Sequence, residues 1–319
     1  MKKIIKMLCI PISILLVLSG CGTVTENKSE EAAVIRMGVL RTADSLPVYI
    51  ADQEDLFEQY GVQVELVEFG SASDQSKAME SGAIDGMMTD MVVQCLLQKG
   101  GTPMRTVTTA LGASVSEGKF MVVSNPDSGI CTAEELEGRS VAISEGTMME
   151  YLVDSYCDIL GISIDSLEKV NIPNLSLRYE TLMAGEVDAA ILPDPLGDLA
   201  VMNGGVAVID DTAMDRNISR SVIAFHEEFI RTHSQEIQKF IQGYNAAIDR
   251  LNENNETDRE LIFEVANVPE IMQDVWEVPH FTKNSVPDEE EVSRLTAWMA
   301  DKGLLEDAYS YDQVVESIF

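Results

Sequence analysis

The chain has 319 residues, of which 45% are hydrophobic and 24% charged, and its formal net charge is −32. This excess of acidic residues argues against nucleic acid and anionic lipid surfaces as partners, because proteins bind both through basic patches. The length exceeds what a single hydrophobic core normally serves, so two lobes are expected.

The N-terminus has the order of a processed leader. Three lysines precede an uncharged apolar run, residues 7–18, and the small residues that follow end at Cys21. This order is typical of a bacterial lipoprotein signal peptide, residues 1–20, with Cys21 carrying a fatty acid such as palmitate. The alternative is a transmembrane helix, but the run is shorter than the about 20 residues that a span needs. Residues 21–33 are then a tether, and the protein is expected outside the cytoplasm, held to the cell membrane by lipid alone.

Cysteines and histidines give no sign of catalysis. Beyond the leader, Cys95, Cys131 and Cys157 form an odd set at irregular spacing, which is no disulfide framework. A Cys131–Cys157 bridge stays open, and Cys95 is expected to be buried in an apolar helix. The histidines match no metal-ligand spacing, and nucleophile-elbow, P-loop and dinucleotide motifs are missing from the sequence. We therefore expect no catalytic residue, metal or cofactor, and no enzyme.

The first half of the chain alternates strands and helices. A turn-rich loop separates the first strand from Ser45, a candidate helix cap, and Gly61 closes the helix that follows. A second strand with alternating polarity comes next, and a second helix closes at Gly82 just before an apolar strand. The predicted elements are a strand at 35–40, a helix at 47–60, a strand at 62–69 and a strand starting near 84.

The second half repeats this design. Gly82 and Gly185 each close a helix, and each is followed three residues later by an aspartate, Asp85 or Asp188. The two aspartates are 103 residues apart. The predicted elements are a strand at 140–144, a helix at 147–160 closed by Gly161, and a strand at 169–172. Strand–helix–strand–helix–strand units predict an α/β fold, with a mostly parallel sheet flanked by helices in each half.

The chain after Phe225 is expected to be almost wholly helical and to pack back onto the first lobe. Residues 234–251 form an amphipathic pattern, and Pro269 is placed at the start of another helix. Further helices are predicted from 286–289 to about Gly303 and from Tyr311 onward.

Several short segments, in this order, carry a family resemblance. They are 35–39, 46–51, 56–62 and 82–86 in the first half, 136–142 and 186–189 in the second, and 286–289 and 298–305 in the tail. With them the sequence resembles the substrate-binding proteins of ABC importers. It is most similar to the SsuA/THI5-like, or NMT1-like, group that handles nitrate, sulfonates, taurine and pyrimidine precursors of thiamine.

The resemblance implies a two-lobed periplasmic-binding-protein fold of type II, hinged around a central cleft. Lobe I would comprise residues 34–121 plus 222–319, and lobe II residues 122–221. The chain would cross between the lobes near 120–124 and 221–225. Such lobes close on a ligand by a hinge motion.

A ligand in such a fold lies beyond the carboxyl ends of the strands, where helices begin. The candidate ligand-binding residues there are Arg41, Thr42, Ser45, Ser71, Thr89, Asp90, Glu145, Gly146, Thr147, Met148, Pro193 and Asp194. Arg41 is the sharpest candidate because a guanidinium can hold an anion with two hydrogen bonds; an ion pair with Asp44 is the alternative. The hydroxyl and carboxylate residues can equally be helix caps, Pro193–Pro195 a stiff turn, and Met148 core filler.

Both tryptophans, Trp276 and Trp298, lie in the tail, which disfavours a flat heterocycle, and the acidic loops disfavour a bare inorganic anion. A small organic molecule, anionic or with an amine part, fits best. The resemblance implies delivery of that molecule to an ABC permease and ATPase by a monomer. The alternatives are a ligand-sensing module for a membrane signalling partner, and a pyrimidine-synthesising enzyme on the same scaffold.

Overall fold

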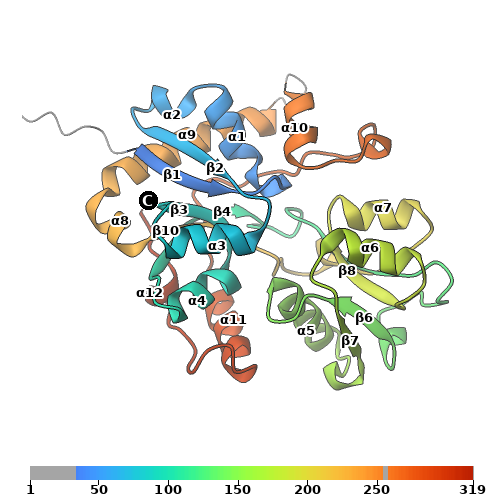
Figure 1. Ribbon diagram of the computed structural model, residues 1–319. Helices are drawn as coiled ribbons and strands as arrows, with labels where there is room; N and C mark the ends of the chain where they lie inside the picture. Colours follow the sequence, from blue (N-terminus) through green and yellow to red (C-terminus); the bar gives the residue numbers. More distant parts are fainter. Residues whose placement is uncertain (1–33, 254–257, 319) are drawn as a thin grey trace, which may run out of the picture. The chain divides into compact units, whose positions relative to one another are not determined.

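The computed structural model describes residues 34–253 and 258–318 (Figure 1). The predicted signal peptide, Cys21 and the tether lie outside the described residues. The described residues all belong to one compact unit, which begins at residue 32. Among its described residues, no helix combines the length and apolarity needed to cross a membrane.

Two five-stranded sheets form the framework. The first has the order β2 (Gln63–Glu68), β1 (Val34–Val39), β3 (Gly86–Asp90), β10 (Ser221–His226) and β4 (Met104–Leu111). The second has the order β7 (Glu168–Asn171), β6 (Ser140–Ile143), β8 (Ala189–Pro193), β5 (Phe120–Ser124) and β9 (Val206–Asp210). In each sheet the fourth strand, β10 or β5, is antiparallel to its neighbours. The predicted mostly parallel sheets are thus confirmed.

The repeated aspartate has the same structural task in both halves. The Asp85 carboxylate accepts a hydrogen bond from the Arg36 amide at 2.9 Å, near the start of β1. The Asp188 carboxylate accepts one from the Ser140 amide, also at 2.9 Å, at the start of β6. Each aspartate therefore ties the strand that follows it to the first strand of its own repeat, which explains the shared spacing.

Helices cover both faces of the first sheet. On one face lie α1 (Leu46–Gln53), α2 (Leu56–Gln59) and α9 (Ser234–Glu253), with the Phe57 and Phe240 rings stacked at 5.0 Å. On the other lie α3 (Ala72–Glu80) and α4 (Met91–Lys99), as Figure 1 shows. Burying apolar side chains on both faces removes the sheet from water, as expected for parallel strands.

The second sheet is covered in the same way. Its helices are α5 (Met148–Leu160), α6 (Leu175–Met183) and α7 (Leu196–Met202). The core on the α5 side also contains Val292, Leu295 and Met299 of α11 (Glu289–Asp301) together with Met91 and Val92 of α4. The tail therefore packs onto the first sheet, as predicted, and through α11 it also contacts the helix that covers the second.

Two predicted helices differ from the structure. The expected helix at 47–60 is broken between α1 and α2, because Asp55 adopts a left-handed conformation with φ of 55°. Pro269 starts only one turn of 3-10 helix, Glu270–Met272, since its own backbone is extended. The structure also has α8 (Glu227–Thr232) directly after β10 and α10 (Arg259–Val265), neither of which was predicted. The last helix predicted from Tyr311 onward is present as α12 (Tyr311–Val314).

Candidate functional site

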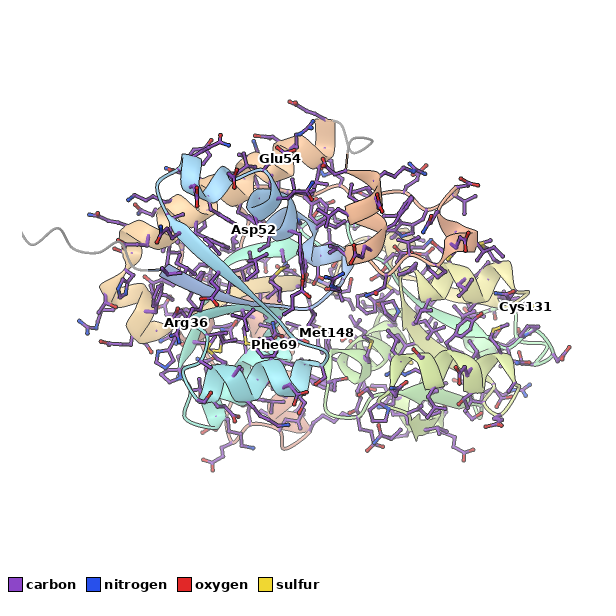
Figure 2. The ribbon with its side chains drawn as sticks, turned by 45° about the horizontal axis from the view of Figure 1, so that its top comes forward. Arg36, Asp52, Glu54, Phe69, Cys131 and Met148 are labelled. Atoms are coloured by element: carbon purple, nitrogen blue, oxygen red, sulfur yellow. The ribbon has the colours of Figure 1, made fainter. Side chains whose placement is uncertain are left out.

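The carboxyl ends of the parallel strands set the position of the candidate site. In the first sheet Val39 pairs with Glu68, so the loops after β1 and β2 leave from the same edge. Asp90, the last residue of β3, pairs with Ser221 at that edge. This edge carries Arg41, Thr42, Ser45, Ser71, Thr89 and Asp90. Figure 2 marks Phe69, which directly follows β2.

The second sheet presents an equivalent edge. The loop after β6 leads into α5, whose first residue, Met148, is labelled in Figure 2. Pro193 ends β8 and pairs with Phe120, and the amide of Asp194 donates to the Lys119 carbonyl at 2.9 Å. This edge carries Glu145, Gly146, Thr147, Met148, Pro193 and Asp194.

Arg41 is held by two carboxylates. Its Nε and Nη2 each lie 3.2 Å from an oxygen of Glu68, and its Nη1 donates to Glu264 of α10. The two carboxylates raise the pKa of the guanidinium. The sequence suggested Asp44 as the partner of Arg41 in an ion pair. Arg41 does form an ion pair, but its partners are Glu68 and Glu264, which lie 27 and 223 residues away in the sequence. Next to this pair, burial and the Glu68 carboxylate raise the pKa of the Tyr49 hydroxyl.

Five hydroxyl and carboxylate candidates have local partners. Ser71 accepts from the Asp74 amide at 3.2 Å, Asp90 from the Val93 amide at 2.9 Å and Thr147 from the Met149 amide at 3.2 Å. These three side chains therefore cap helices α3, α4 and α5. Ser45 makes no side-chain cap bond, contrary to the prediction, and its hydroxyl lies 3.3 Å from that of Thr42.

The loop before α5 is held by a carboxylate of its own helix. The amide of Gly146 donates to Oε2 of Glu150 at 2.8 Å, and the amide of Glu145 donates to Asn171 at 3.1 Å. The Glu145 side chain is exposed, whereas Met148 is 5% exposed and belongs to the core. The Gly146 amide, a predicted anion contact, is thus already bonded to a carboxylate.

Asp194 is a candidate whose carboxylate is bonded on one oxygen only in the described part of the chain. Its Oδ2 accepts a hydrogen bond from the Trp276 indole, while its Oδ1 is buried and has no hydrogen-bond partner within 34–253 or 258–318. Burial raises the pKa of Asp194 to about 6, and the nearby carboxyl of Asp198 adds to the rise. The sequence analysis assigned Trp276 to the tail and not to the site. Trp276 and Asp194 are 82 residues apart, so their contact could not be predicted from a local sequence pattern.

A buried charge cluster stands behind the Gly146 loop. Lys302, which directly follows α11, lies 2.8 Å from Glu150 and 2.8 Å from Asp154, and Lys169 contacts both acids as well. The indole of Trp298 donates to Asp154 at 3.0 Å. We call Glu150, Asp154, Lys169, Lys302 and Trp298 the α5–α11 cluster. It connects the tail to the helix that begins at the second edge.

The two segments that join the sheets, 112–119 and 211–220, contain further buried polar groups. Asp211 is fully buried and accepts from the Ser219 and Tyr156 hydroxyls at 2.7 and 3.2 Å. Burial raises its pKa to about 6. Arg220 pairs with Glu291 at 3.0 Å. These contacts fix the connections next to both edges; the lobe boundaries, 121/122 and 221/222, stay predictions.

With this geometry in place, comparison with known proteins gives a family. The NMT1/THI5-like family matches residues 42–257, well over half of the chain. The chain belongs to that family.

Two relatives and a solved structure illustrate the family's range. A protein of Brachyspira hyodysenteriae, provisionally named an ABC transporter periplasmic binding protein, is 26% identical over 79% of this chain and 75% of its own length. The 4-amino-5-hydroxymethyl-2-methylpyrimidine phosphate synthase of Schizosaccharomyces pombe is 21% identical over 68% of this chain and 65% of its own. The Escherichia coli periplasmic aliphatic sulphonate binding protein SsuA superposes with a TM-score of 0.73 at 17% identity, covering 88% of this chain and 97% of SsuA.

These likenesses confirm the expected periplasmic-binding-protein fold. They assign no ligand contact to this NMT1/THI5-like chain, so the roles of the twelve candidate residues in ligand binding stay predictions. Cys95 and Cys157 are buried free thiols and Cys131, labelled in Figure 2, is an exposed one, so the Cys131–Cys157 bridge is not formed in the structure. Within the described ranges, no group of three or more His, Cys, Asp and Glu side chains is arranged to hold a metal.

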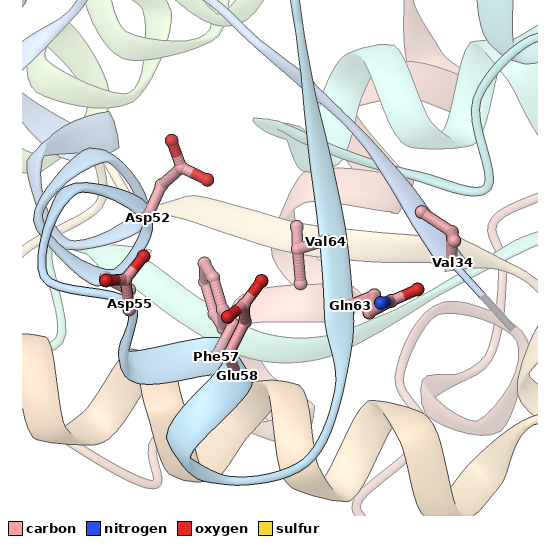
Figure 3. A pocket seen from close by; sticks show the side chains of 8 residues that line it. Val34, Asp52, Asp55, Phe57, Glu58, Gln63 and Val64 are labelled. Carbon is pink, nitrogen blue, oxygen red and sulfur yellow. The ribbon is translucent and has the colours of Figure 1, made fainter. Parts of the chain in front are cut away.

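A separate pocket of about 230 Å³ lies at the opposite end of the first sheet. Figure 3 shows Asp52, Asp55 and Glu58 on its α1–α2 side, facing Val34 and Gln63 at the starts of β1 and β2. Burial and the nearby Asp55 raise the pKa of Asp52. Because this pocket adjoins the amino ends of the strands, it is distinct from the candidate site.

Proposed function

We propose that this protein is an extracytoplasmic solute-binding protein that captures a small organic ligand between its two sheets and delivers it to an ABC importer. The main support is one observation: two sheets with equivalent strand orders each have helix starts and candidate polar residues at the carboxyl ends of their parallel strands. The chain that contains them belongs to the NMT1/THI5-like family. The ABC transporter named in the Brachyspira relative supports the importer as partner.

The working mechanism needs two bodies that move about the joining segments. We assign residues 34–121 plus 222–319 to one lobe and 122–221 to the other. The ligand would be buried as the two candidate edges approach each other, and a membrane permease with its ATPase would recognise the closed form. The protein would act as a monomer, with no cofactor.

The membrane connection is proposed from the leader alone. Cys21 would be acylated after removal of residues 1–20, which keeps the protein at the outer side of the cell membrane. Replacing Cys21→Ser should release the protein from the membrane fraction, whereas Cys131→Ser should leave it there. Mass spectrometry of the N-terminal peptide checks the modification directly. An unmodified Cys21 in the mature protein would contradict the anchor.

Thermal unfolding against a ligand panel tests the binding function. Purified full chain would be mixed with sulfonates, nitrate, carboxylates, amino acids, pyrimidines and vitamins. A ligand present at about 1,000 times its dissociation constant stabilises the folded state by about 4 kcal/mol. In parallel, small-angle scattering with the same ligand should show compaction. A chain that binds no member of the panel and never compacts would refute the proposal.

An enzyme remains the competing function because of the pyrimidine phosphate synthase among the relatives. We expect a binding protein instead, since the sequence combines a lipoprotein-like leader with none of the catalytic motifs searched for. Incubation of the full chain with pyridoxal phosphate, followed by mass spectrometry of the small molecules, separates the two functions. Formation of a pyrimidine product would favour the enzyme.

A further inference from the structure

The positive side chains at the two candidate edges are neutralised by the protein itself. Arg41 contacts both Glu68 and Glu264. Lys119, at the second edge, lies 2.8 Å from Asp198 and 4.0 Å from Asp210. Each cation therefore has two carboxylates, and each group retains a net negative charge. An anionic ligand would have to displace one of these acids before it could use either cation.

At the starts of α4 and α5 some of the backbone donors are also taken, whereas the starts of α1 and α7 have no side-chain cap in the part of the chain that the structure describes. A free helix N-terminus attracts anions through its unpaired amides. Here the Asp90 carboxylate accepts from the start of α4, and Glu150 and Thr147 accept from the start of α5. An anion approaching the start of α5 therefore meets the negative charge of Glu150, whereas burial raises the pKa of Asp90 at the start of α4.

Arg178 lies under the second edge but is not available to a ligand. The residue is 1% exposed, and its guanidinium donates to the carbonyls of Ile172 and Ile191 at 2.9 and 3.0 Å. It joins the ends of β7 and β8 to α6 from within the core. Its charge is therefore directed to backbone carbonyls rather than to the surface where a ligand would bind.

Unused bonding capacity at the second edge belongs to an acceptor oxygen. Oδ1 of Asp194 has no hydrogen-bond partner among the described residues, although the other oxygen is fixed by Trp276. A buried carboxylate oxygen without a donor is costly, and a donor supplied by a ligand would remove that cost.

We infer, resting on the proposed solute-binding function, that the ligand carries a positively charged nitrogen, which the Asp194 carboxylate binds beside the Trp276 indole. Asp198 also lies close to Asp194, and it is itself paired with Lys119 at 2.8 Å. The ligand class is therefore a cationic organic solute such as an amine or quaternary ammonium compound, and not the sulfonate named for the structural neighbour.

Tryptophan fluorescence of the full chain provides the test, because Trp276 and Trp298 are its two tryptophans. Choline, putrescine, thiamine and benzylamine are the cationic probes, and ethanesulfonate, nitrate and phenylmethanesulfonate are the anions. Benzylamine and phenylmethanesulfonate share a ring and differ in charge. At least one cation should bind and alter the emission. The Trp298→Phe variant should keep this signal, and Trp276→Phe should lose it.

Variants at one carboxylate identify the contact. Asp194→Asn keeps an acceptor for Trp276 but removes the charge, and should weaken binding of the cation about tenfold or more. Asp158→Asn, which removes an exposed charge at the far end of α5, should not change it. Asp194→Glu should recover part of the affinity. Circular dichroism of each variant separates lost binding from lost folding.

Three results would overturn the inference. Binding of the anions in preference to the cations would refute the ligand class and leave the solute-binding function intact. Equal affinity of Asp194→Asn and the unaltered protein for a cation would refute the contact. Binding of neither charge class, with no compaction in scattering, would count against both the inference and the proposed function.

Discussion

The α5–α11 cluster is expected to stabilise the fold substantially, and Asp154→Asn tests this. The Asp154 side chain is 2% exposed and bonds Lys169, Lys302 and Trp298. The asparagine is the same size but uncharged. It leaves two lysines to share the single carboxylate of Glu150, so positive charge becomes unbalanced in a place with little water.

The magnitude follows from burial. Removing one partner of a buried ion pair costs about 3–5 kcal/mol. The Lys302 side chain is 33% exposed and the Lys169 side chain 16%, so both can turn partly toward water. We therefore expect the lower end, about 3 kcal/mol. For a chain of this length that loss lowers the melting temperature by about 6 °C.

Differential scanning calorimetry at neutral pH measures the loss, with Asp158→Asn as the control. Asp158 lies one turn further along α5, is exposed, and bears the same charge. Its replacement should shift the melting temperature by less than about 1 °C, since surface substitutions usually change stability little. Equal melting temperatures for the two variants would show that the cluster contributes nothing, and would refute the reasoning from burial.

Two other substitutions test different parts of the structure. Asp211 has a folded pKa of about 6, about 2 units above its usual value, so its neutral form favours folding. The stability from this proton is present below about pH 4 and is lost as the pH rises through 6. Between pH 4.5 and 7.5 the melting temperature of the natural protein should therefore fall relative to Asp211→Asn; parallel curves would contradict this. Gly243→Ala should destabilise by about 1–3 kcal/mol in urea unfolding, despite better helix propensity. An added Cβ would meet Phe57 at 2.8 Å, and a more stable variant would disprove this close contact.

Local signals in the sequence were sufficient for most of the architecture. Gly61, Gly161 and Gly185 have φ of 79°, 73° and 73°, so a residue type that tolerates this conformation marked the helix ends reliably. Asp55 adopts the same region without being glycine, and the break between α1 and α2 was missed for that reason. Pro269 illustrates the opposite error, because proline is compatible with the first turn of a helix but does not create one.

The candidate site was only partly predictable. Its position at the strand ends followed from the order of elements. The partners of its side chains did not, because they come from elsewhere in the chain: Glu264 reaches Arg41 from α10, and Trp276 reaches Asp194 from the loop after it. Neither contact has a sequence pattern, so the guanidinium looked available for an anion when it was not. Tertiary structure, and not local propensity, decides the charge of this site.

The placement of β10 has a consequence for the order in which the protein forms during synthesis. The second sheet is built from one continuous stretch, β5 to β9, and can complete its pairing once residue 210 has emerged. The first sheet cannot, because β10 fills the position between β3 and β4 more than a hundred residues after β4 ends. Loop closure over such a separation is slow. The first sheet, most of whose strands are synthesised first, therefore completes its strand pairing after the second sheet.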